Sequence, residues 1–142
     1  MLVTEPQIAG LPDELSIYLN EHYYLDGNRL RRFSLRMDGF VSVYAPYSGG
    51  EMVTRPLVFE GRNLIINYST SAAGSIRVEV TNRSGQPISG LALADCPEIY
   101  GDEIEKVVEW NSGSDLSRLA GQIIRLRFEL RDADLYSLQF QP

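Results

Sequence analysis

The sequence predicts an all-β fold, an antiparallel two-sheet β-sandwich of about nine short strands. Three segments alternate between apolar and polar side chains, at residues 33–37, 75–83 and 122–131. A period of two with one charged face is typical of a strand that has one face on the core and the other in water. Glycine-containing turns recur at intervals of roughly eight to twelve residues, which favours a sandwich or a barrel.

Six more segments are less regular but rich in β-branched, aromatic and leucine side chains, so we expect strands there too. They lie at residues 14–20, 40–45, 51–59, 63–69, 104–110 and 134–140. Among the turns, Ala73-Gly74 is expected to separate two strands and Asp38-Gly39 to form a tight hairpin turn. Residues 86–102 are either a sheet-crossing connection or a loop that carries a site. One helical turn is expected at residues 115–120, ended by Gly121.

The composition excludes some classes of function. The 142 residues include 19 acidic and 13 basic side chains, a formal net charge of −6. A nucleic-acid-binding protein needs a clustered electropositive face, so we expect no nucleic-acid partner. No apolar run approaches the roughly 18 residues of a membrane-spanning helix, so we expect no membrane span. The N-terminal residues do not resemble a signal peptide. We expect a bacterial protein, for which both a cytoplasmic and an exported location stay open.

Catalytic residues are scarce. The chain has one histidine, His22, and one cysteine, Cys96, and no nucleophile, metalloprotease or phosphate-binding motif. A glycosidase would need two carboxyls across a cleft, but carboxylates at turns usually bind the backbone. The candidates are Asp95, Glu98, Asp102, Glu103, Asp132 and Asp134, for example the pair Asp102 and Asp134. No calcium-loop pattern is present, so Ca²⁺ is only a weak candidate and the metal content stays open. We therefore expect no enzymatic activity and no cofactor.

Exposed aromatic side chains are the other route to function, because flat rings can stack on sugars. Tyr44 has the opposite strand parity to Val41 and Val43, while Tyr47 and Tyr100 lie in loops, where binding residues concentrate. These three tyrosines are the candidate carbohydrate-binding residues. Trp110 shares its parity with Val108, which predicts that it faces the core.

Several segments resemble the C-terminal region of large bacterial glycoside-hydrolase-like proteins that carry a five-bladed propeller of the family 32/43 type. The segments are residues 54–57, 64–79, 101–102, 107–110, 113–117, 119–121, 126–128 and 132–138, within a stretch from about residue 14 to residue 140. The resemblance implies a jelly-roll-like (concanavalin-like) sandwich that follows the propeller. It also implies that the catalytic carboxylates belong to the propeller.

From this resemblance we expect two parts: residues 1–28, a remnant of a preceding propeller domain, and residues 29–142, the sandwich. The expected function is a non-catalytic accessory sandwich that partners a propeller-type catalytic domain and binds carbohydrate weakly. The alternative is a structural or oligomerising module without a ligand. Self-association would then use the N-terminal edge strand at residues 15–19, because an unpaired apolar edge invites pairing.

Overall fold

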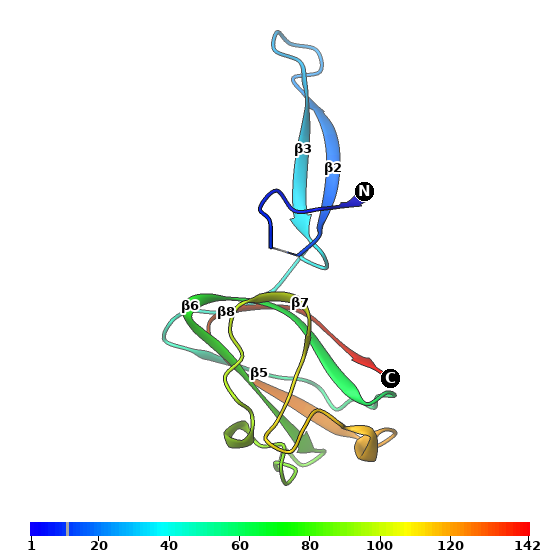
Figure 1. The fold of residues 1–142 in the computed structure, drawn as a ribbon, viewed down its shortest axis with the longest axis vertical. Helices are drawn as coiled ribbons and strands as arrows, with labels where there is room; N and C mark the ends of the chain where they lie inside the picture. The colour runs from blue at the N-terminus through cyan, green and yellow to red at the C-terminus, as the bar shows by residue number, and fades with distance from the viewer. Residues whose placement is uncertain (11) are drawn as a thin grey trace. The chain divides into compact units, whose positions relative to one another are not determined.

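The computed structural model describes residues 1–10 and 12–142 and divides the chain into two compact units, Met1–Val41 and Ser42–Pro142 (Figure 1). The described residues form eight strands in two sheets, and every pairing is antiparallel. The helical residues are two 3-10 turns, η1 (Leu93–Asp95) and η2 (Ser117–Leu119). The predicted all-β, antiparallel, two-sheet fold class is confirmed.

The N-terminal unit is a three-stranded sheet in the order β1 (Leu2–Thr4), β2 (Glu14–Glu21), β3 (Arg29–Arg36). β2 and β3 pair in register from Glu14↔Arg36 to Glu21↔Arg29 and form a long hairpin (Figure 1). The expected boundary between residues 28 and 29 therefore falls inside a hairpin, and the units divide between Val41 and Ser42 instead. The edge strand expected at residues 15–19 has β3 on one side, and β1 covers its first residues on the other.

The N-terminal unit has almost no interior. Of its described residues only Ser16 is buried. The register places apolar side chains on one face of the sheet, because paired residues point the same way: Val3, Leu15, Ile17, Leu19, Phe33 and Leu35. Phe33 and Leu19 are 41% and 53% exposed, so this apolar face lies open.

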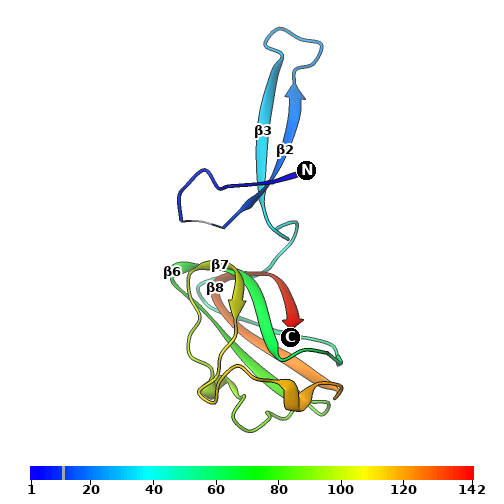
Figure 2. The ribbon, with the colours of Figure 1, turned by 45° about the vertical axis from the view of Figure 1, so that its right-hand side comes forward.

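The C-terminal unit holds five strands: β4 (Val43–Ala45), β5 (Gly50–Val53), β6 (Asn63–Asn82), β7 (Asp102–Val107) and β8 (Ile124–Gln141). Their order is β4-β8-β6-β7, and β5 also pairs with β8. β6 and β8 are the two central strands and pair along nearly their whole length. Both strands bend sharply near the middle (Figures 1 and 2), so the two halves of the same pair of strands lie in the two layers of the unit.

A large bulge makes this bend. Thr70 pairs with Ala133 and the next pair is Ser75↔Arg131, so residues 71–74 of β6 face the single residue Asp132 of β8. Asp132 has φ 42°, in the left-handed region, and a Cβ on Gly74 would lie 2.3 Å from the Asp132 carbonyl oxygen. The turn expected at Ala73-Gly74 is thus a bulge inside a continuous strand. Extra residues in one strand bend it and re-aim its side chains.

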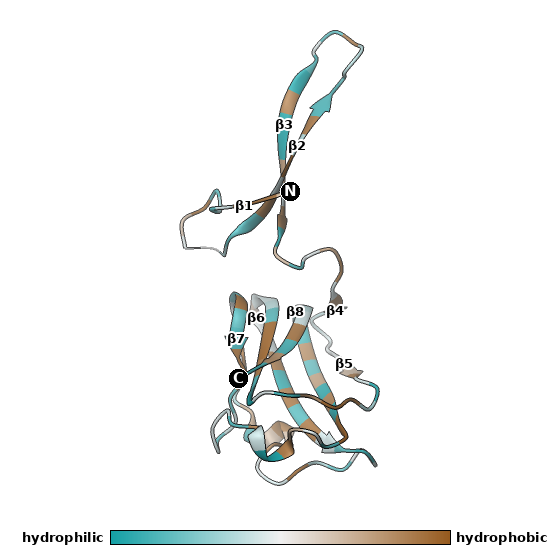
Figure 3. Cartoon of the chain, turned by 90° about the vertical axis from the view of Figure 1, so that its right-hand side faces the viewer, coloured by the Kyte–Doolittle hydropathy of each residue, from teal (hydrophilic) through white to brown (hydrophobic). Residues whose placement is uncertain are grey.

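The core lies between the two halves of the bent ladder. Leu64, Ile66 and Tyr68 come from the first half of β6 and Ile76, Val78 and Val80 from the second, and all six are fully buried in one cluster. Alternating hydrophobic and hydrophilic stripes run along β6 and β8 (Figure 3). Trp110 is buried as predicted, and its Nε1 donates to the Val78 carbonyl at 2.9 Å. The result is a sandwich-like unit built from one folded sheet.

Several predicted strands are shorter than expected. The strand predicted at residues 51–59 ends at Val53, ahead of Pro56, which has no N–H to donate to a ladder. Residues 104–110 form regular strand only to Val107. Asp38-Gly39 forms no hairpin, because β3 and β4 belong to different units. In the described part of the chain, no helix has the length and apolar character needed to cross a membrane.

Candidate functional site

Three loop segments meet the bend of β8 and surround Arg131. They are the β4–β5 loop with Tyr47, the β6 bulge at residues 71–74, and the segment before β7 with Tyr100. Three open depressions lie among them, and each shares lining residues with the next. We call the three together the bulge groove.

The first depression has a volume of about 550 Å³ and lies beside Tyr47. Its wall includes Glu51, Glu129 and Arg131. The Arg131 guanidinium carbon lies 4.1 Å from the centre of the Tyr47 ring, a cation–π contact. The loop that carries Tyr47 is anchored where Asp132 and Gly49 both donate their backbone N–H to the Pro46 carbonyl, at 3.1 and 2.8 Å.

The second depression, of about 300 Å³, is floored by the bulge. Small residues from Ala72 to Ser75 form one side, and Glu98, Tyr100 and Arg131 complete the lining. Arg131 therefore stands between this depression and the first. The bulge places Arg131 there, because it determines which β8 residue pairs with which β6 residue on each side of the bend.

Tyr100 is 73% exposed, while hydrogen bonds hold the backbone on both sides of it. On one side, Ile99 exchanges two hydrogen bonds with Ile76, at 2.8 and 2.9 Å. On the other, Gly101 and Thr70 bond at 2.8 and 3.0 Å. The buried Tyr68 hydroxyl donates to the Tyr100 carbonyl at 2.8 Å. A fixed backbone beneath an exposed ring lowers the entropy lost when a ligand stacks on that ring.

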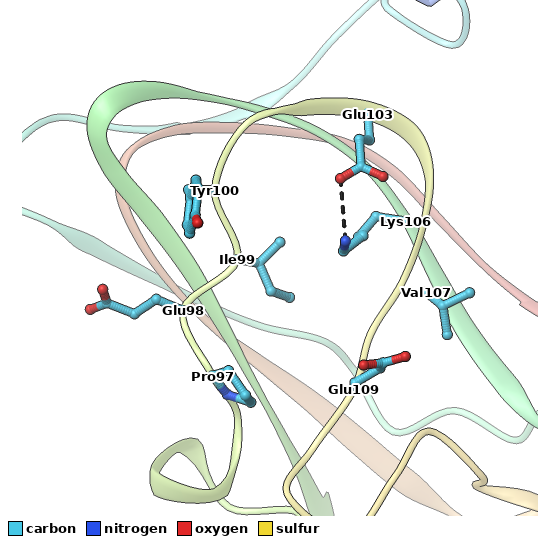
Figure 4. Close-up of a pocket in the computed structure, with 8 residues that line it drawn as sticks. All are labelled: Pro97, Glu98, Ile99, Tyr100, Glu103, Lys106, Val107 and Glu109. Carbon is cyan, nitrogen blue, oxygen red and sulfur yellow. Dashed lines mark ion pairs between the residues drawn. The ribbon is translucent and has the colours of Figure 1, made fainter.

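The third depression, of about 380 Å³, shares Glu98 and Tyr100 with the second. Figure 4 shows it framed by two stretches of chain, with Ile99 and Lys106 between them and Glu98 directed outward. Lys106 forms an ion pair with Glu103 at 3.3 Å, and Glu98 pairs with Arg77 at 3.2 Å.

Tyr44, the third predicted tyrosine, lies elsewhere in the unit. It is 61% exposed and pairs with Asp134, which pairs in turn with Ser69, and Ser69 also pairs with Asp102. The side chains of this row point to the outer face. Tyr68, the residue before Ser69 in β6, faces the core, and successive residues of a strand point to opposite faces. The candidate carboxylates Asp102 and Asp134 thus share a row with Ser69 between them. Of the six candidate carboxylates, only Glu98 and Glu103 line the bulge groove.

No family model matches this chain, and neither curated proteins nor solved structures yield a match.

Among the described residues no group of three or more His, Cys, Asp or Glu side chains is placed to hold a metal ion. Cys96 is buried, and this burial raises the pKa of its thiol, against the opposing effects of the Val78 N–H and Arg77. His22 belongs to the N-terminal unit and Cys96 to the C-terminal one. The bulge groove instead offers two exposed aromatic rings, an arginine and several carboxylates, which suit non-covalent binding.

Arg131 is the residue that sequence reasoning missed. In the sequence, Arg131 is simply the last polar residue of the alternating segment 122–131. A signal was present in the small residues Ala72, Ala73 and Gly74 between two strand-like segments, since glycine within a strand often marks a bulge. Which β8 residue the bulge would oppose depends on a register between distant segments, which local patterns do not encode.

Proposed function

We propose that this protein is a non-catalytic accessory β-sandwich that binds carbohydrate weakly in the bulge groove. The observation that carries the proposal is the placement of Tyr47 and Tyr100 in adjoining depressions on either side of Arg131. Aromatic rings present a rigid apolar face, and arginine and carboxylates supply the hydrogen bonds that fix a polar ligand. Open depressions favour modest affinity, because they cover only part of a ligand's surface.

The resemblance to the C-terminal region of propeller-bearing glycoside-hydrolase-like proteins supports the accessory role. In such an arrangement the partner is a propeller-type catalytic domain, and the sandwich holds the polymer near it. The open apolar face of the N-terminal unit fits this role, because a sheet without a core gains stability when another surface covers it.

The test is retardation of the protein in native gels that contain soluble polysaccharides. We expect retardation by at least one neutral glycan, reduced about tenfold or more in apparent affinity by Tyr100→Ala or Tyr47→Ala, since stacked aromatic groups commonly dominate such sites. Tyr24→Ala, which removes a 91% exposed ring from the other unit, is the matched control. Loss of retardation with Tyr44→Ala alone would place the site on the outer row instead.

A second candidate is a structural module that self-associates. The specific observation is the open apolar face of the N-terminal unit, which has no buried apolar residue among those described. Sedimentation equilibrium of the wild type and of Phe33→Asp distinguishes the two roles. A dimer that the substitution dissociates, together with no retardation on any glycan, would support the structural module and contradict carbohydrate binding.

A further inference from the structure

We infer that the bulge groove takes an interior stretch of an extended, uncharged glycan chain, with Arg131 as the residue that orients it. This inference rests on the proposed carbohydrate binding and adds the ligand class and the residue that selects it.

The arrangement of the depressions favours a chain over a single sugar. Arg131 lines both the first and the second depression, and Glu98 and Tyr100 line both the second and the third. A ligand that contacts both tyrosines must therefore pass Arg131 and occupy more than one depression. All three are open to solvent rather than enclosed, so a chain can enter and leave at either end without having to present a terminus.

The guanidinium of Arg131 has N–H groups available to donate hydrogen bonds to a ligand. Within the described part of the chain it forms no ion pair, although Glu51, Glu98 and Glu129 line the same depressions. The first two of these carboxylates pair instead with Arg127 and Arg77. The guanidinium carbon of Arg131 lies over the Tyr47 ring, a contact that restrains the side chain without using its N–H groups to bind an oxygen. Placed between two depressions, these donors can reach hydroxyls of the sugars on both sides.

The charge of the groove selects against acidic chains. Five carboxylates line the three depressions, from Glu51, Glu98, Glu103, Glu109 and Glu129. The cations beside them are four, Arg131 and Lys106 in the lining and Arg127 and Arg77, which pair with Glu51 and Glu98, so five carboxylates against four cations leave an excess of one negative charge. A polyuronate would bring one negative charge per sugar into this surface, and like charges brought together reduce affinity and select against the wrong ligand. A neutral chain incurs no such repulsion and uses the carboxylates as hydrogen-bond acceptors.

The experiment has two stages with the full chain. First, native gels compare neutral polymers (β-glucan, mannan and xylan) with polygalacturonate and alginate at low salt. Second, calorimetry follows the monosaccharide-to-hexasaccharide series of whichever neutral polymer binds. We expect retardation by a neutral polymer only, and an affinity that rises from the monosaccharide to about the trisaccharide and then levels off.

Arg131→Gln tests the orienting role. We expect about tenfold weaker binding of the hexasaccharide with little change for the disaccharide, because a short ligand can occupy the third depression, which Arg131 does not line. Arg83→Gln, in an exposed turn, is the matched control. Thermal melting of both variants shows whether they fold, and Arg131→Lys, which keeps the charge but loses the planar fork, should fall between wild type and Arg131→Gln.

The possible failures are distinct. If no polymer of either class is retarded, the proposed carbohydrate function is wrong and this inference fails with it. If a polymer binds but the monosaccharide binds as tightly as the hexasaccharide, or an acidic polymer binds best, the carbohydrate function stands and the extended neutral chain is wrong. An unchanged hexasaccharide affinity in Arg131→Gln overturns the role of Arg131.

Discussion

At the residue scale, the candidate site depends on side chains that hold other residues in place. Tyr68 is fully buried in the core, yet its hydroxyl supports the backbone of the exposed Tyr100. Asp132 sits at positive φ next to Arg131 and donates its N–H to the loop that carries Tyr47. Strained backbone persists only where the surrounding structure holds it, and such positions cluster at sites of function.

Tyr68→Phe tests the support beneath Tyr100. Removing the hydroxyl leaves the Tyr100 carbonyl without this donor, so we expect a loss of about 1–2 kcal/mol in the free energy of unfolding. If carbohydrate binds as proposed, retardation should weaken as well. Urea denaturation and gel retardation measure the two effects, with Tyr18→Phe, at a half-exposed tyrosine of the other unit, as control. Equal stability of Tyr68→Phe and Tyr18→Phe would contradict this account.

Cys96 offers a prediction about reactivity and pH. Its thiol is buried and its pKa lies above the ordinary value of 9.0, chiefly through loss of hydration. We expect reaction with a disulfide reagent at pH 8 to be at least about tenfold slower in the native protein than in urea. Because the folded pKa is the higher one, this group's contribution to stability is complete below the unfolded pKa. It is lost as the pH rises through the folded pKa.

Denaturation curves between pH 7 and pH 10 check the sign of that effect. The wild type should lose stability at the alkaline end by more than Cys96→Ala does. A native thiol that reacts as fast as the unfolded one would show that the cysteine is accessible.

At the element scale, the bend of β6 and β8 organises both the core and the groove. The bulge lets one pair of strands supply both layers, and it places Arg131 between the two tyrosines. Gly74 is essential to this geometry, because its backbone lies against the carbonyls of Arg131 and Asp132.

Gly74→Ala should destabilise the C-terminal unit by roughly 2–3 kcal/mol or more, since the new methyl group would meet two carbonyl oxygens at 2.3 and 2.7 Å. Gly85→Ala is an informative control: that glycine has φ 81° but open space around it. Its cost should be about 1 kcal/mol, from backbone strain alone. Thermal or urea unfolding measures both. A smaller loss for Gly74→Ala than for Gly85→Ala would show that the bulge adapts easily.

Local patterns in the sequence predict strands well and their continuity poorly. The alternation of Ile124, Leu126 and Phe128 with charged residues predicted one buried face, and all three are buried. The predicted segments 63–69 and 75–83, however, form one strand, as do 122–131 and 134–140. A turn and a bulge use the same small residues, and only pairing with a distant strand decides between them. For the same reason Tyr47 and Tyr100 could be proposed from the sequence, but not their common neighbour Arg131.

At the scale of the whole molecule, the two units differ in how they are stabilised. Every buried apolar residue of the described chain lies in Ser42–Pro142. In the N-terminal unit, polar contacts cross the other face of the sheet, where Arg32 bonds to Thr4, Ser16 and Glu14. Partly exposed polar contacts of this kind contribute modest net stability, so the unit depends mainly on its strand pairing and on whatever covers its apolar face.

We predict that residues 42–142 expressed alone fold cooperatively, whereas residues 1–41 alone do not. The first segment retains the whole hydrophobic cluster, and the second has a sheet without a core. Circular dichroism with thermal melting and amide proton dispersion in NMR measure the outcome. A cooperative melt of the isolated N-terminal segment would show that its strand pairing is sufficient.

The long β6–β8 ladder also determines when this protein can begin to fold. It joins Asn63 to Gln141 and Asn82 to Ile124, with β7 and both 3-10 turns in the intervening chain. Such distant pairings require closure of a long loop before any apolar surface is buried, so folding should be slow for a domain of this size. During synthesis, β6 leaves the ribosome before β8, so its apolar side chains stay exposed until β8 has been made and has paired with it. Loss of the second half of β8, which pairs with the first half of β6, would therefore leave Leu64, Ile66 and Tyr68 on a strand without this partner.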